Sequence, residues 1–95
     1  MAQVSKETGV LAVLATRMVE ERLPKALALK ERVDRGDTLN DLDLVFLDEV
    51  VKGANEIMPM VKDNPKVKDV AARMLQLYRE ITTKALENEN ARKTS

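Results

Sequence analysis

Four aspartates are the first residues in this chain whose types and spacing could support chemistry. Asp37, Asp41, Asp43 and Asp48 occupy positions 1, 5, 7 and 12 of a twelve-residue window, as the oxygen ligands of a calcium-binding loop do. Such a loop also needs an oxygen ligand at position 3 and a glycine at position 6, and leucines stand at both places. Because acids also suit the positively polarised start of a helix, we predict a helix start here and no metal site.

The sequence lacks most of the side chains that enzymes commonly use for catalysis. Histidine and cysteine are absent from all 95 residues, which excludes imidazole-dependent triads, thiol nucleophiles and the common zinc, copper and haem ligands. The adjacent carboxylates at Glu20–Glu21 and Asp48–Glu49 fall on faces that we expect to be solvated. The three glycines are isolated, so there is no glycine-rich phosphate loop. We therefore predict a protein that is not an enzyme, with no catalytic residues and no cofactor.

The stretch Leu39–Val61 contains the most clearly marked helix, and it would position these acids. Asn40 is a good N-cap and Asp43 completes a variant of the capping box. Two apolar stripes follow, so neighbours should cover the helix from two sides, and Pro59 should kink or end it. One stripe holds Leu47, Val50, Val51, Ala54, Met58 and Val61, and the other holds Leu42, Phe46, Gly53, Ile57 and Met60.

The preceding segment predicts one long helix after a frayed N-terminus at residues 1–6. Arg35 ends this helix and Gly36 supplies its C′ residue. Proline inside a helix removes a hydrogen bond and clashes with the carbonyl group four residues earlier, so Pro24 is a point of strain. Leu23 is a poor N-cap and the apolar periodicity continues past the proline, which favours a kink near Pro24. If Pro24 instead breaks the helix, the chain has four helices.

A third helix is predicted to start where Asn64 can act as N-cap and Pro65 as the first helical residue. Most of its apolar residues fall on one face, which ends at Ala85, while Leu75 and Leu86 lie off that face. Residues 87–95 lose the apolar content and are predicted to be a disordered tail. With no period-two alternation and short connections, we predict an all-α fold: a single domain over residues 1–95 whose three helices run up, down and up.

Charge is balanced overall and uneven along the chain. Sixteen basic and sixteen acidic residues cancel, so no global field attracts nucleic acid or an anionic membrane. The segment 34–56 holds seven acids and two bases. This acidic middle suits either pairing with the mildly basic flanks inside the bundle or an acidic face for a basic partner. The bases of the last helix alternate with acids and the chain has only two aromatic residues, so we predict no nucleic-acid binding.

No signal-peptide pattern appears at residues 1–8, and the longest apolar run, residues 10–15, is far short of the ~20 residues of a membrane span. A cytoplasmic protein is therefore expected, with a membrane as an improbable partner.

The remaining feature is apolar surface beyond what one packed seam needs. We predict a partner-binding face at Leu42, Phe46, Ile57 and Met60, used for self-association as a homodimer or for another protein. Phe46 carries the argument because it is the only phenylalanine and lies about 100° from Leu47 on the helix. The competing interpretation is that neighbouring helices cover these residues, with the kinked first helix lying over Phe46.

These observations favour a small helical protein-protein interaction or regulatory module. The alternative is a membrane-surface or scaffold protein that docks through an amphipathic segment at Gly9–Leu23. The polar face of that segment mixes two arginines with two glutamates, and so lacks the excess of basic residues that membrane-surface helices use.

Overall fold

The computed structural model describes residues 6–61 and 64–94, and every regular element within them is helical. Lys6–Arg17 form α1, Met18–Arg22 form the π-helical turn η1, and Leu23–Asp34 form α2. Asp41–Ile57 form α3, Met58–Met60 form the 3₁₀ turn η2, and Pro65–Thr94 form α4. The predicted all-α fold is confirmed. The predicted frayed N-terminus lies outside the described residues, except that α1 already begins at Lys6.

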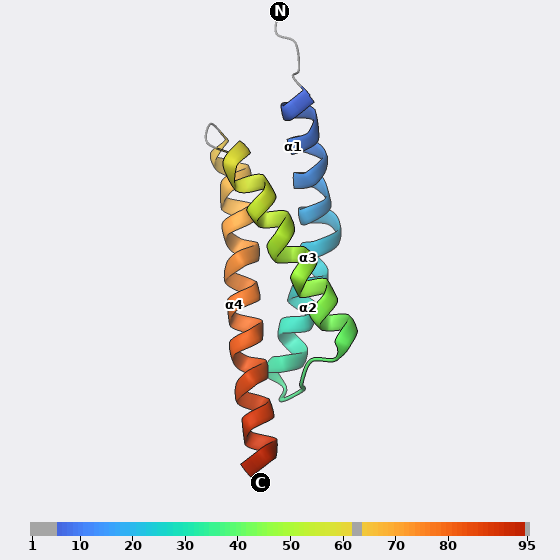
Figure 1. Ribbon diagram of the computed structural model, residues 1–95, viewed down its shortest axis with the longest axis vertical. Coiled ribbons are helices and arrows are strands. Elements are labelled where there is room, and N and C mark those ends of the chain that lie inside the picture. The colour runs from blue at the N-terminus through green and yellow to red at the C-terminus, as the bar shows by residue number, and fades with distance from the viewer. Residues whose placement is uncertain (1–5, 62–63, 95) are drawn as a thin grey trace, which may run out of the picture.

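The first helical rod runs through Pro24 without a break. Arg17, Arg22 and Leu23 all have right-handed helical backbone angles, so α1, η1 and α2 form one continuous rod (Figure 1). The irregularity that proline demands takes the form of a π-helical turn, in which the N–H of Leu23 donates to the carbonyl of Met18, five residues back. The prediction of three helices is therefore confirmed, and the four-helix alternative is excluded.

The second helix begins and ends at the signals that the sequence carries. Asn40 Oδ1 accepts from the N–H of Asp43 at 2.9 Å, and Asp43 Oδ2 accepts from the N–H of Asn40 at 3.0 Å, which makes the capping box complete. Pro59 lies inside η2, immediately after α3 ends at Ile57.

The third helix, α4, is longer than the sequence suggested. It starts at Pro65 as predicted, but it continues to Thr94, so the prediction of a disordered tail at residues 87–95 is wrong for all but Ser95, which lies outside the described residues. The helix continues past residue 87 because Asn88 is packed against the end of α2. Asn88 is 9% exposed and hydrogen-bonds to the end of α2 and to the loop that follows it. A polar residue thus extends the packed seam beyond the last apolar one, and the helix propagates through it.

The three rods pack up, down and up into an elongated bundle with extents of 65 × 20 × 17 Å (Figure 1). The α4 helix packs against both α2 and α3. Both apolar stripes of α3 contribute to the core, because the first rod lies on one side and α4 on the other. The largest fully buried side chains are Met18, Val33, Leu47, Val50, Ile57, Val61, Met74, Leu77 and Ile81.

Candidate functional site at the α2–α3 corner

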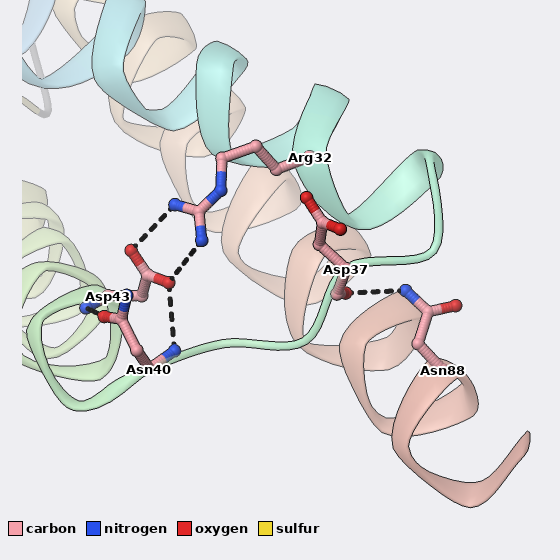
Figure 2. Close-up of polar contacts among 5 residues, drawn as sticks. All are labelled: Arg32, Asp37, Asn40, Asp43 and Asn88. Carbon is pink, nitrogen blue, oxygen red and sulfur yellow. Dashed lines mark hydrogen bonds and ion pairs between the residues drawn. The ribbon is translucent and has the colours of Figure 1, made fainter. Parts of the chain in front are cut away.

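A bidentate salt bridge ties the end of α2 to the start of α3 (Figure 2). Arg32 Nη1 donates to Asp43 Oδ1 and Arg32 Nη2 donates to Asp43 Oδ2, and both distances are 3.0 Å. The side chain of Asp43 is 13% exposed and that of Arg32 is 36% exposed. Because two parallel hydrogen bonds fix the plane of both groups, this pair sets the position of α3 on α2 and not merely the distance between them.

Both oxygens of the Asp43 carboxylate accept hydrogen bonds from other residues of the protein. The carboxylate serves Arg32 and also accepts from the N–H of Asn40 in the capping box. The hydrogen bonds from Arg32 hold the pKa of Asp43 below its usual value, with the Asn40 N–H acting in the same direction and partial burial opposing both. The carboxylate therefore stays ionised at neutral pH and has no free oxygen for acid–base chemistry or for a cation.

The chain leaves α2 through a Schellman motif. Gly36 has φ +103°, a conformation that side chains disfavour, and its N–H donates to the carbonyl of Val33 at 3.0 Å. The N–H of Asp37 donates to the carbonyl of Arg32 at 3.1 Å. The predicted role of Gly36 as the residue after the helix is confirmed.

Asn88 of α4 holds the same corner from the other side. Its Nδ2 atom donates to the carbonyl oxygen of Val33 at 2.7 Å. It also donates to the carbonyl oxygen of Asp37 at 2.8 Å (Figure 2). One amide group thereby gives the Val33 carbonyl a second hydrogen bond, beside that from the Gly36 N–H, and supplies one to the Asp37 carbonyl in the following loop. Capping box, salt bridge, Schellman motif and Asn88 together make the α2–α3 corner a rigid support.

The aspartates of the calcium-like spacing do not converge. Asp43 is bound by Arg32, while Asp48 Oδ2 pairs with Lys52 Nζ at 2.9 Å one turn further along α3. Within residues 6–61 and 64–94, no three acidic side chains come close enough together to hold a metal ion.

The structure separates the four residues of the predicted partner-binding face. Leu42 is 80% exposed, and Phe46 is only 7% exposed. Both line a groove of about 310 Å³ between α2 and α3, together with Ala28 and Leu29. Lys25 Nζ lies 4.9 Å from the centre of the Phe46 ring, so the first rod covers this side chain as the competing interpretation expected.

Ile57 and Met60 lie near the other end of α3. Ile57 is completely buried, and Met60 is half-buried against the core. The prediction of Phe46 and Ile57 as surface residues is therefore wrong, because the second apolar stripe of α3 is itself covered. Of the four residues, only Leu42 is fully available to a partner.

Sequence reasoning missed two exposed apolar residues beside Leu42. Leu44 is 51% exposed and Val45 is 57% exposed, and neither belongs to either apolar stripe of the helix. That mismatch was the available signal, since an apolar residue outside both stripes has no core to join. We call the following exposed set the α3 outer face: Asp41, Leu42, Leu44, Val45, Asp48, Glu49, Lys52 and Glu56.

A second groove, of about 340 Å³, lies between the first rod and the start of α4. It is lined by Ala15, Val19, Val67 and Val70, with Thr16, Glu20 and Lys66 beside them. A third, polar groove joins Lys30 and Asp34 of α2 to residues of α4 that include Glu80, whose Oε1 lies 3.9 Å from Arg73 Nη1. Neither groove combines large, highly exposed apolar side chains with a rigid support.

Comparison with known proteins places no constraint on the function of these surfaces. No protein-family model matches the chain, and no curated protein or solved structure matches it either. Among the described helices, none has the length and apolar character needed to span a membrane. The geometry of the α2–α3 corner and of the α3 outer face is therefore the basis for any functional conclusion.

Proposed function

We propose that the protein is a non-catalytic helical interaction module that binds another protein through the α3 outer face. The observation that carries this proposal is the cluster of Leu42, Leu44 and Val45, all more than half exposed within four consecutive residues. A single exposed leucine needs no explanation. Three large apolar side chains on little more than one helical turn expose apolar surface that sums to the order of 300 Å², spread over about 160° of the helix circumference, and exposed apolar surface of this extent is often functional.

The support beneath this cluster favours binding. The helix that carries it starts at a complete capping box and is held to α2 by Arg32. A surface fixed before a partner arrives loses less conformational entropy on binding, which raises affinity for a given contact area.

Docking to a membrane surface through the first rod has weaker support. Among the side chains of α1 and η1 that the structure describes, Val13 and Val19 are the large exposed apolar ones. Glu20 and Glu21 follow Val19 directly, whereas helices that dock on membranes carry an excess of basic residues on their polar face.

The proposal is tested by comparing three forms of the full chain as bait in an extract of its source cells. These are the natural sequence, a Leu44→Ser/Val45→Ser double variant and a Leu86→Ser control. Leu86 is 59% exposed on α4, so the control removes a comparable leucine elsewhere. Circular dichroism melts first establish that all three fold. We expect at least one protein to bind the natural sequence and the control, and to be lost with the double variant. An identical set of proteins on all three baits would overturn the proposal.

A further inference from the structure

The charge around the apolar cluster indicates which kind of partner it fits. On the α3 outer face, four exposed carboxylates accompany one ammonium group, that of Lys52. Lys52 pairs with Asp48 at 2.9 Å and also interacts with Glu49, while Arg22 and Lys25 of the first rod line a groove beside Glu49. The face itself, with four carboxylates and one ammonium group, keeps a net charge of −3. The apolar cluster therefore sits in a negative field that attracts cationic groups.

The acids interleave with the apolar side chains. At 100° per residue, Leu42, Val45 and Leu44 span about 160° of the helix circumference, in that order. Asp41 and Asp48 project within the interval between Leu44 and Val45, one turn before and one turn after, and Glu49 projects between Val45 and Leu42. Any group that covers the apolar side chains must therefore also meet these carboxylates.

A second copy of the chain is a poor occupant. A two-fold contact pairs a surface with itself, so it would set the carboxylates of the two copies against each other. This repulsion counts against the homodimer that the sequence suggested.

We propose that the partner segment is a basic amphipathic helix. This inference rests on the proposed interaction function and names the chemical class of its partner. The apolar side of such a helix covers Leu44 and Val45, while its lysines and arginines meet Asp41, Asp48 and Glu49. The groove beside Leu42, of about 310 Å³, receives one large aliphatic side chain against Ala28 and Leu29.

The two cations that line this groove do not oppose a basic partner strongly. Arg32 is neutralised by Asp43, and Lys25 lies over the ring of Phe46, with its ammonium group 4.9 Å from the ring centre. The groove lining carries two cations and one carboxylate, so the anchor side chain that enters it is uncharged, and the positive charges of the partner lie over the outer acids.

The test measures fluorescence anisotropy of labelled peptides of about 18 residues, long enough for five helical turns, titrated with the full chain. The probe peptide contains leucine and lysine in amphipathic order. One control has the same composition in scrambled order, and a second replaces every lysine with glutamate. We expect the probe to bind in the micromolar range and to weaken about tenfold between roughly 50 and 500 mM salt, because salt screens exposed charges. Neither control peptide should bind comparably.

Three protein variants locate the site. Leu44→Ser/Val45→Ser should weaken probe binding about tenfold or more, Asp48→Asn/Glu49→Gln should flatten the salt dependence, and Leu86→Ser should change neither. Equal binding of the glutamate peptide, or an unchanged affinity in the Leu44→Ser/Val45→Ser variant, would overturn the inference. If that variant still loses a protein from the extract while the lysine peptide does not bind, the interaction function stands and the basic class of partner is wrong. Sedimentation equilibrium at hundreds of micromolar that showed a dimer lost in the same variant would assign the face to a second copy instead.

Discussion

Asn88 Nδ2 lies 2.7 Å from the carbonyl oxygen of Val33, although the two residues are 55 positions apart in the chain. A single side-chain amide near the C-terminal end of α4 thus hydrogen-bonds to a carbonyl group at the C-terminal end of α2. This contact joins the last turns of the bundle to the α2–α3 corner, and it is the described contact that explains why α4 stays packed beyond its last buried apolar residue, Ala85.

Asn88→Leu should destabilise the bundle by about 1–3 kcal/mol, because it leaves carbonyl groups of Val33 and Asp37 with one partner fewer in a buried setting. Urea unfolding followed by circular dichroism measures this loss. Hydrogen exchange should show the largest loss of protection in the last two turns of α4. Asn55→Leu is the matched control, since Asn55 is exposed on α3, and it should change stability by less than about 0.5 kcal/mol. Equal losses for the two variants would contradict the anchoring role of Asn88.

The salt bridge predicts a pH dependence with a definite sign. The pKa of Asp43 is lowered in the folded protein from its usual 3.8, so the contribution of this group to stability is complete above 3.8 and disappears as the pH falls through the folded-state pKa. At neutral pH, Asp43→Asn should cost roughly 0.5–1 kcal/mol, because Arg32 is more than a third exposed and water screens the pair. The difference between the two proteins in urea unfolding should be constant from about pH 5 to 7 and should shrink toward pH 2. A difference that persists unchanged at pH 2 would mean that the ion pair contributes nothing.

Gly53→Ala should be neutral to stabilising, by up to about 1 kcal/mol, even though Gly53 is buried in α3. The added methyl group would collide with the guanidinium of Arg22, and the other atoms around it leave room. Because that guanidinium is the free end of a flexible side chain, Arg22 can swing away while the helix gains the higher propensity of alanine. Thermal melts of Gly53→Ala in the natural chain and with Arg22→Ala should both show the gain. A loss above about 1 kcal/mol in both would indicate a backbone clash instead.

Truncation should lower the free energy of unfolding by very different amounts at two residues of one α3 stripe. Phe46→Ala should cost about 3–5 kcal/mol, since it empties a packed position beneath the first rod, whereas Leu42→Ala should cost less than about 0.5 kcal/mol. Denaturant unfolding of both variants provides the comparison. Similar losses at the two positions would mean that α2 does not cover Phe46 as described.

Signals that act within a few residues were readable from the sequence. Gly36, the pair Asn40–Asp43 and Pro65 each fixed a helix end, because capping and left-handed turns depend on local backbone geometry. The continuous first rod also followed from local evidence, since Leu23 is a poor N-cap for a separate helix that would start at Pro24.

Distant contacts were not readable. Nothing near Asn88 indicates that it meets the end of α2, so its segment was read as a tail from its polar composition alone. Leu42 and Phe46 lie one turn apart on one stripe, and only the position of α2 makes one exposed and the other buried. Periodicity gave the direction in which each side chain points, and it could not say where the covering helix ends.

The π-helical turn at Met18–Arg22 has a consequence for the seven-residue repeat of the first rod. Buried Leu11 and Met18 are seven residues apart, as are buried Ala26 and Val33, but eight residues separate Met18 from Ala26. The wider turn absorbs this one inserted residue. An unbroken repeat from Met18 would have placed Lys25 and Arg32 on the inner face of the bundle. The insertion moves both cations to its edge, where Lys25 meets Phe46 and Arg32 meets Asp43.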